Sequence, residues 1–241
     1  MEKISFREIF YESLELLKAD KKRFGMLLSV MVVLGFLSDI FKGKAISSLI
    51  SIGSIGIFVF MSISTIIVCQ KFIEKRFIID TDTMIKRLNA ELGKSFLLIL
   101  FEGLIILGAF LVMLIPLVVI LTAVGSNLDR SPSFVVYFAV ILFSIPLMIV
   151  NIMISYSLQY LLIKKNKVIE SVQNSYYLVK NQFKRAMIIG LKINLFYYLV
   201  VILFFKVPLL GALTTNALGI IYTIMNTFVF YRLMEENTYE I

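Results

Sequence analysis

Two ionisable side chains, Glu102 and Lys192, lie inside long apolar stretches of the sequence. Each follows the polar start of its stretch, at Ser95 and Arg185, by the same number of positions. On helices with a rise of about 1.5 Å per residue, both would lie about 10 Å beyond those starts. They could pair across neighbouring helices, or each could extend separately towards the polar end of its own helix. Glu102 and Lys192 are therefore the candidate intramembrane polar pair.

Neutral amides form a second group of candidates. Asn151, Asn194 and Asn226 lie in further apolar stretches. Amides on several helices could line a polar cavity. They could equally form hydrogen bonds between helices, which contribute about 0.6 kcal/mol each in membranes.

Two prolines fall within neighbouring apolar stretches, Pro116 in LVMLIPL and Pro146 in LFSIPL. Proline removes one helical hydrogen bond and can kink a helix. Such kinks would serve either as hinges of a transporter or as packing adjustments, and both roles are compatible with the sequence.

The residues needed for familiar catalysis are missing from the sequence. The chain has no histidine and a single cysteine, Cys69, which excludes a Ser-His-Asp triad and nearly all zinc sites. It carries no phosphate-binding loop and no dinucleotide fingerprint. We expect no enzyme activity, no catalytic residues, no cofactor and no metal. An intramembrane enzyme would have to rely on Glu102 and Asp39.

The elements that carry these residues are predicted to be membrane-spanning helices. Hydrophobic residues make up 59% of the chain, and about 20 consecutive apolar residues suffice to cross a bilayer. The sequence predicts an all-α polytopic membrane protein with six transmembrane helices. These helices are expected at residues 24–41, 46–69, 95–123, 134–162, 186–205 and 208–231.

The distribution of basic residues predicts the orientation. Of 24 lysines and arginines, 18 lie in segments 1–23, 70–94 and 163–185, which would share one side of the membrane with Arg232. The connections on the other side would carry four, Lys42, Lys44, Arg130 and Lys206. The positive-inside rule places these segments and both termini in the cytoplasm. We therefore expect a multi-pass protein of the bacterial cytoplasmic (inner) membrane. Its basic residues would contact the lipid bilayer and its anionic headgroups, and no nucleic-acid-binding module is present.

Amphipathic patterns precede spans one, three and five and predict interfacial helices there. Two of them align at an offset of 162 positions, which pairs Ser13 with Ser175 and gives the shared pattern E-x4-S-x2-L-x-K-x3-K-R. The alternative is chance similarity between basic amphipathic helices. We interpret residues 1–241 as one membrane domain of three units, 1–69, 70–162 and 163–241.

These two segments also carry a family resemblance. Residues 168–186 (VIESVQNSYYLVKNQFKRA) and 12–24 (ESLELLKADKKRF) resemble an element of the membrane domain of bacterial glycerophosphoryl diester phosphodiesterases and of related six-helix membrane proteins. The resemblance implies a bacterial inner-membrane protein without a defined role. From the whole sequence we expect a membrane-structural, regulatory or transport-associated role. It does not imply phosphodiesterase activity, because that activity belongs to a separate soluble domain that uses histidine.

A second hypothesis comes from another class of protein. A six-span chain with a cytoplasmic amphipathic helix is similar to permease subunits of small exporter-type ABC transporters. Residues 70–94 would then contact a separate cytoplasmic ATPase. Copurification of an ATPase would favour this hypothesis, whereas a chain that purifies alone or with copies of itself would favour the first.

Overall fold

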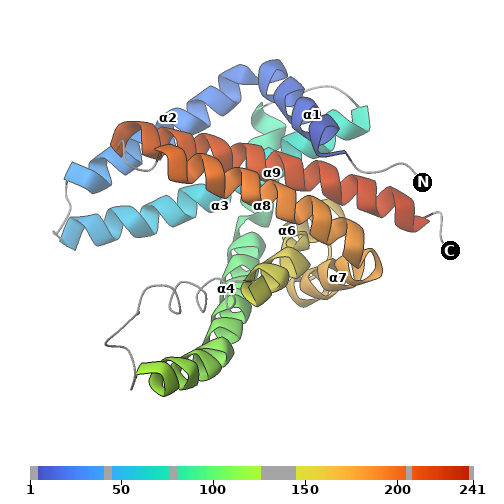
Figure 1. Cartoon of the computed structure of the whole chain (residues 1–241). Helices are drawn as coiled ribbons and strands as arrows, with labels where there is room; N and C mark the ends of the chain where they lie inside the picture. Colours follow the sequence, from blue (N-terminus) through green and yellow to red (C-terminus); the bar gives the residue numbers. More distant parts are fainter. Residues whose placement is uncertain (1–4, 41–44, 76–80, 126–144, 205–207, 239–241) are drawn as a thin grey trace.

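The computed structural model describes residues 5–40, 45–75, 81–125, 145–204 and 208–238, and Figure 1 shows their arrangement. In these ranges the regular secondary structure is entirely helical, as the sequence predicts. The helices are α1 (Phe6–Ala19), α2 (Lys21–Ile40), α3 (Ala45–Lys75), α4 (Thr81–Gly125), α6 (Ser157–Ile163), α7 (Val168–Asn181), α8 (Phe183–Phe204) and α9 (Pro208–Thr238), and residues 145–154 are helical as well.

Five helical segments in the described part of the chain are long and apolar enough to cross a membrane. They are Gly56–Glu74, Asp82–Pro116, Ile145–Ile163, Phe183–Leu203 and Ala217–Glu235. These segments fall within or overlap five of the predicted spans. The remaining span, 24–41, falls on α2, whose middle includes side chains outside the described set. The chain is thus a helical protein compatible with a multi-pass membrane location.

Three segments form the centre of the bundle, and we call them the return helices: α3, residues 145–163, and α9. Each is the last long helical segment of a predicted unit. Half or more of the described residues in their membrane-crossing windows are buried, against 33% in α8 and 6% in α4. Their buried faces carry aliphatic and aromatic side chains that share one core, including Ile63, Ile67, Ile152, Ile224 and Phe230.

The other long helices lie around this centre. Helix α2 packs against α3 and α9, and α8 packs against α9. The C-terminal half of α4 extends away from the remaining helices in Figure 1, and its side chains are largely exposed, for example Val112 and Ile115. Exposed aliphatic side chains along a whole helix suit a surface that faces lipid.

The first and last units share a helix pair with matching bounds. Adding 162 to the first and last residue numbers of α1 gives the first and last residue numbers of α7. Adding 162 to the first residue number of α2 gives the first residue number of α8. Ser13 and Ser175 occupy equivalent positions and are both fully buried. The backbone therefore repeats at the offset that aligns the two sequence segments.

A one-residue interruption separates the two helices of each pair. Asp20 ends α1 and Gln182 ends α7, with nearly equal backbone angles and the same type of capping bond. The side chain of Gln182 donates to the carbonyl oxygen of Leu233 on α9 at 2.8 Å. Asp20 instead pairs with Arg23 at 3.0 Å. Burial raises the pKa of the Asp20 carboxyl, an effect that Arg23 partly opposes.

The middle unit differs from the expected arrangement. The amphipathic segment before span three is not a separate helix but the first part of α4, which runs without a break for 45 residues. No residue near Gly93 interrupts the hydrogen-bonding pattern, and a Cβ added at Gly93 would meet nothing within 4 Å. Met84 and Leu88 of this segment are buried in the shared core, so its apolar face packs against protein.

Candidate functional site

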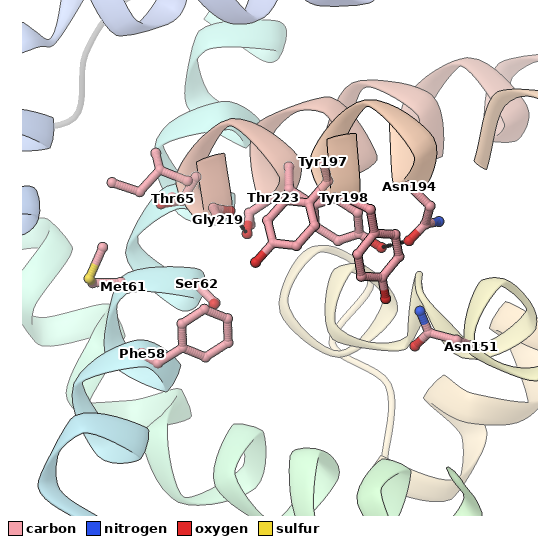
Figure 2. A pocket seen from close by; sticks show the side chains of 12 residues that line it. Phe58, Met61, Ser62, Thr65, Asn151, Asn194, Tyr197, Tyr198, Gly219 and Thr223 are labelled. Carbon is pink, nitrogen blue, oxygen red and sulfur yellow. Dashed lines mark hydrogen bonds between the residues drawn. The ribbon is translucent and has the colours of Figure 1, made fainter. Parts of the chain in front are cut away.

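A cavity of about 340 Å³ lies between all three return helices and α8. Figure 2 shows Phe58 and Ser62 of α3 on one side, Asn151 opposite them, and Tyr197 and Tyr198 of α8 between. Among the described side chains that line it, none is charged. The lining consists of Phe58, Met61, Ser62, Thr65, Asn151, Asn194, Tyr197, Tyr198, Gly219, Ile220, Tyr222 and Thr223.

Hydrogen bonds fix several of these polar groups. The hydroxyl of Tyr222 donates to Oδ1 of Asn194 at 3.4 Å, and Nδ2 of Asn194 donates to the carbonyl oxygen of Gly190 at 2.8 Å. Thr223 donates to the carbonyl oxygen of Gly219 at 2.9 Å, one turn earlier on α9. The wall formed by α8 and α9 is therefore held in place before any ligand binds.

Thr65 is a deeply buried member of the lining. Thr65 is 1% exposed, and its hydroxyl oxygen makes no hydrogen bond with the described part of the chain. A buried hydroxyl without a partner costs about 1–3 kcal/mol. The hydroxyl oxygen itself is not exposed to the cavity, so this cost belongs to the packing around α3 and is not evidence of a ligand.

The cavity lies near mid-depth along the helices. Ser62, Asn151 and Asn194 are roughly 17–20 Å along their helix axes from the ends that join the basic segments, at about 1.5 Å per residue. The hydrocarbon core of a bilayer is about 30 Å thick. A cavity at this depth in a membrane would be surrounded by apolar material, and hydrogen bonds would be its means of selecting a ligand.

The middle return helix is interrupted beside this cavity. Residues 145–154 and α6 are separated by a turn at Ser155 and Tyr156. Ser175 of α7 bridges the interruption: its hydroxyl donates to the carbonyl oxygen of Met153 at 2.8 Å and accepts from the amide N–H of Tyr156 at 3.1 Å. The two backbone groups freed by the break are thus satisfied from a different helix.

The structure separates the two candidate charged residues. Glu102 is partly exposed and contacts Ser157 at the start of α6. Lys192 is exposed on α8. Among the described residues, no ion pair joins them, so the geometry gives the proposed pairing no support.

The candidate asparagines differ in whether they line the cavity, and the candidate prolines do not coincide with the helix interruption. Asn151 and Asn194 line the cavity, whereas Asn226 is buried in α9 outside the lining. Pro116 lies within α4, and Pro146 lies at the start of the described part of its helix. The interruption in this helix occurs at Tyr156, about three turns beyond Pro146.

Sequence reasoning missed the tyrosines. Tyr197, Tyr198 and Tyr222 supply most of the aromatic surface of the cavity, and the rings of Tyr197 and Tyr222 lie 5.5 Å apart between centroids. The available signal was the helical spacing of Gly219, Tyr222 and Thr223, which places small and polar residues on one face of an apolar helix.

The described residues include no group of three or more potential metal ligands. Comparison with protein-family models, curated protein sequences and solved structures finds no match for the chain. The resemblance described above therefore stays a prediction, and the functional argument rests on the geometry of the cavity.

Proposed function

We propose that the chain is a six-span protein of the bacterial inner membrane, with cytoplasmic termini, that binds a small neutral molecule in the mid-depth cavity. Its role is transport-associated or regulatory rather than catalytic. The observation that carries this proposal is the cavity between the return helices and α8, whose described lining combines neutral hydroxyl and amide groups with aromatic side chains.

The lining defines the class of ligand. It offers neutral hydrogen-bonding groups beside the apolar side chains of Phe58 and Met61. An ion would meet no opposite charge among the described lining residues, and its dehydration would cost much free energy. A neutral molecule with a few hydroxyl, carbonyl or amide groups and an apolar part fits both surfaces.

The interrupted return helix supports a transport-associated role. Binding sites of secondary transporters are commonly formed by discontinuous helices near the middle of the membrane. Here the break at Ser155 and Tyr156 follows Asn151 by about one turn, and Asn151 lines the cavity. A short connection held by one serine from α7 offers a place where the helix could bend.

Filling the cavity is expected to displace the ligand. Gly219 is in the lining, and a Cβ at this position would meet only a ring carbon of Phe58, at 3.8 Å. Gly219→Leu is therefore expected to fit and to occupy ligand volume. After purification in mild detergent, mass spectrometry should detect a neutral molecule with the wild type. We expect its occupancy to fall about tenfold or more in the variant, the equivalent of about 1.4 kcal/mol.

Gly103→Leu is the matched control, because a Cβ at Gly103 meets nothing within 4 Å on the exposed part of α4. This control should leave the occupancy unchanged. If no neutral molecule copurifies with the wild type, or if both variants retain it equally, the binding proposal is wrong. A stoichiometric ATPase in the same preparation would instead support the permease hypothesis.

A further inference from the structure

A second groove, separate from the mid-depth cavity, lies between α4 and the start of α7 and encloses about 460 Å³. Its apolar surface comes from Leu97 and Phe101 of α4 and from Val168 and Ile169 of α7. Leu97 is 56% exposed and Ile169 is 60% exposed. Large aliphatic side chains are thus exposed in one groove, at the end of the bundle that carries the basic segments.

One lysine lines this groove, and three more lie close to the lining residues in sequence. Lys167 lines it, and Lys164 and Lys165 are exposed in the short connection just before α7. On α4, Lys94 is 64% exposed and precedes Leu97 by one turn on the same helix face. Both helices that form the groove therefore carry lysines within one turn of the residues that line it.

The acidic groups nearby do not cancel this charge. The Glu170 carboxylate, which also lines the groove, accepts a hydrogen bond from the backbone N–H of Lys167 at 3.1 Å. Glu91 lies 3.7 Å from the Lys94 amino group. The lining itself holds Lys167 and Glu170, and the residues next to it add Lys94, Lys164, Lys165 and Glu91. Two carboxylates and four lysines give these two segments a net positive charge.

We propose that this groove binds one anionic phospholipid of the cytoplasmic leaflet. The lipid phosphate contacts Lys164, Lys165 and Lys167, and the start of an acyl chain lies on Leu97, Phe101 and Ile169. The charge of the lysines is complementary to the phosphate, and the apolar surface continues from the polar end of α4 into its membrane-crossing part. The inference rests on the membrane placement given under Proposed function but not on the ligand proposed there.

The backbone at Lys165 gives a second argument. Lys165 has a φ of 57°, and among the described non-glycine residues it alone has a positive φ. It follows the C-cap residue of α6, a position where glycine is usual because it adopts this conformation without strain. A lysine at this position contributes a charge where local structure alone would favour glycine, which indicates that the charge has a use.

The absence of tryptophan from the chain makes a direct test possible. Ile169→Trp places a single fluorophore in the groove, and Leu203→Trp places one at a 74% exposed position on α8 as a control for bulk lipid. Both proteins are reconstituted in phosphatidylcholine vesicles that contain a small fraction of phosphatidylglycerol or phosphatidylcholine brominated on the acyl chains. Bromine quenches tryptophan fluorescence on contact.

We expect brominated phosphatidylglycerol to quench the Ile169→Trp protein several-fold more than brominated phosphatidylcholine does, and the two lipids to quench the Leu203→Trp protein equally. Each Lys→Gln change at positions 164, 165 and 167 should lower the affinity of the groove for phosphatidylglycerol about fivefold. Equal quenching of the tryptophan in the groove by both lipids would overturn the lipid site. The site would also be overturned if added inorganic phosphate released the brominated phosphatidylglycerol and removed its extra quenching. Absence of quenching in both proteins would overturn the membrane placement itself.

Lys165→Gly separates the role of the charge from the role of the fold. This change keeps the backbone conformation and relieves its strain, so thermal stability in neutral detergent should stay the same or rise. The affinity of the groove for phosphatidylglycerol should nevertheless fall about fivefold. A variant that keeps the full affinity would show that Lys165 does not contact the lipid and would contradict this part of the site.

Discussion

Replacing Arg87 with methionine is expected to lower the free energy of unfolding by about 3 kcal/mol, which is the largest effect that we expect from one substitution. Arg87, in the first part of α4, donates from Nη2 to Oε1 of Gln70 at 2.6 Å and to the carbonyl oxygen of Leu162 at 2.8 Å. One guanidinium thus joins α4 to two return helices at the ends that carry the basic segments.

The surroundings of Arg87 explain the size of the effect. Leu162 lies in the last turn of α6, where free carbonyl groups and the helix dipole favour a cation. Gln70 is 8% exposed and also donates to Oε1 of Glu74 at 2.7 Å. Removing Arg87 leaves the Gln70 oxygen and the Leu162 carbonyl without this donor, and each loss costs about 1–3 kcal/mol.

Lys86→Met is the matched control, because Lys86 is the exposed neighbour of Arg87 on the same helix. The same change in side-chain type should alter stability there by less than about 0.5 kcal/mol. Unfolding of both variants in detergent can be followed by circular dichroism. Equal stability of the two variants would contradict the role given to Arg87.

Ser175→Ala is expected to cost about 2 kcal/mol, the second large effect. The Ser175 hydroxyl satisfies both backbone groups at the interruption of the middle return helix, the Met153 carbonyl and the Tyr156 N–H. Alanine satisfies neither group, and both belong to buried or partly buried residues. We therefore expect a lower midpoint of thermal unfolding in detergent and faster proteolysis at the interruption.

The internal repeat supplies the control for this change. Ser13 occupies the position equivalent to Ser175 and is equally buried, but its hydroxyl donates within its own helix to the Ile9 carbonyl at 2.7 Å. That carbonyl can also accept the ordinary helical bond, so Ser13→Ala should cost less than about 0.5 kcal/mol. If the two alanine variants lose equal stability, bridging of the interruption is not what Ser175 contributes.

The sequence was sufficient to predict the helical class and the helix pair that repeats, because both depend on local patterns. Apolar stretches of about 20 residues indicate spans wherever they occur. The pairing of Ser13 with Ser175 could be found because the two segments share polar residues at matching positions. Continuous α4 was not predicted, since an amphipathic start and an apolar continuation can belong to one helix.

The site was predicted only in part, because helix rotation decides which polar residues meet. Asn151 and Asn194 were candidates as amides in apolar stretches, and both line the cavity. Glu102 and Lys192 were expected at similar depth but contact different surroundings, since depth along a helix does not fix the direction of a side chain. Tyr222 was missed because its ring suits both a lipid-facing position and a cavity.

The most direct test of the account asks whether the mid-depth cavity can be reached from water in a membrane. The single native cysteine is buried, so Cys69→Ala gives a background without reactive thiols. Ser62→Cys then places a thiol in the cavity lining, and Ile66→Cys places one on the next turn of α3, where the native residue is 1% exposed and outside the lining.

In reconstituted vesicles, N-ethylmaleimide should label the Ser62→Cys protein roughly ten times faster than the Ile66→Cys protein, because reaction requires a hydrated thiol that can ionise. The Gly219→Leu change, which fills the cavity, should remove the difference. Equal labelling of the two thiols, whether fast or slow, would contradict the central claim that the chain holds a hydrated binding cavity within the membrane.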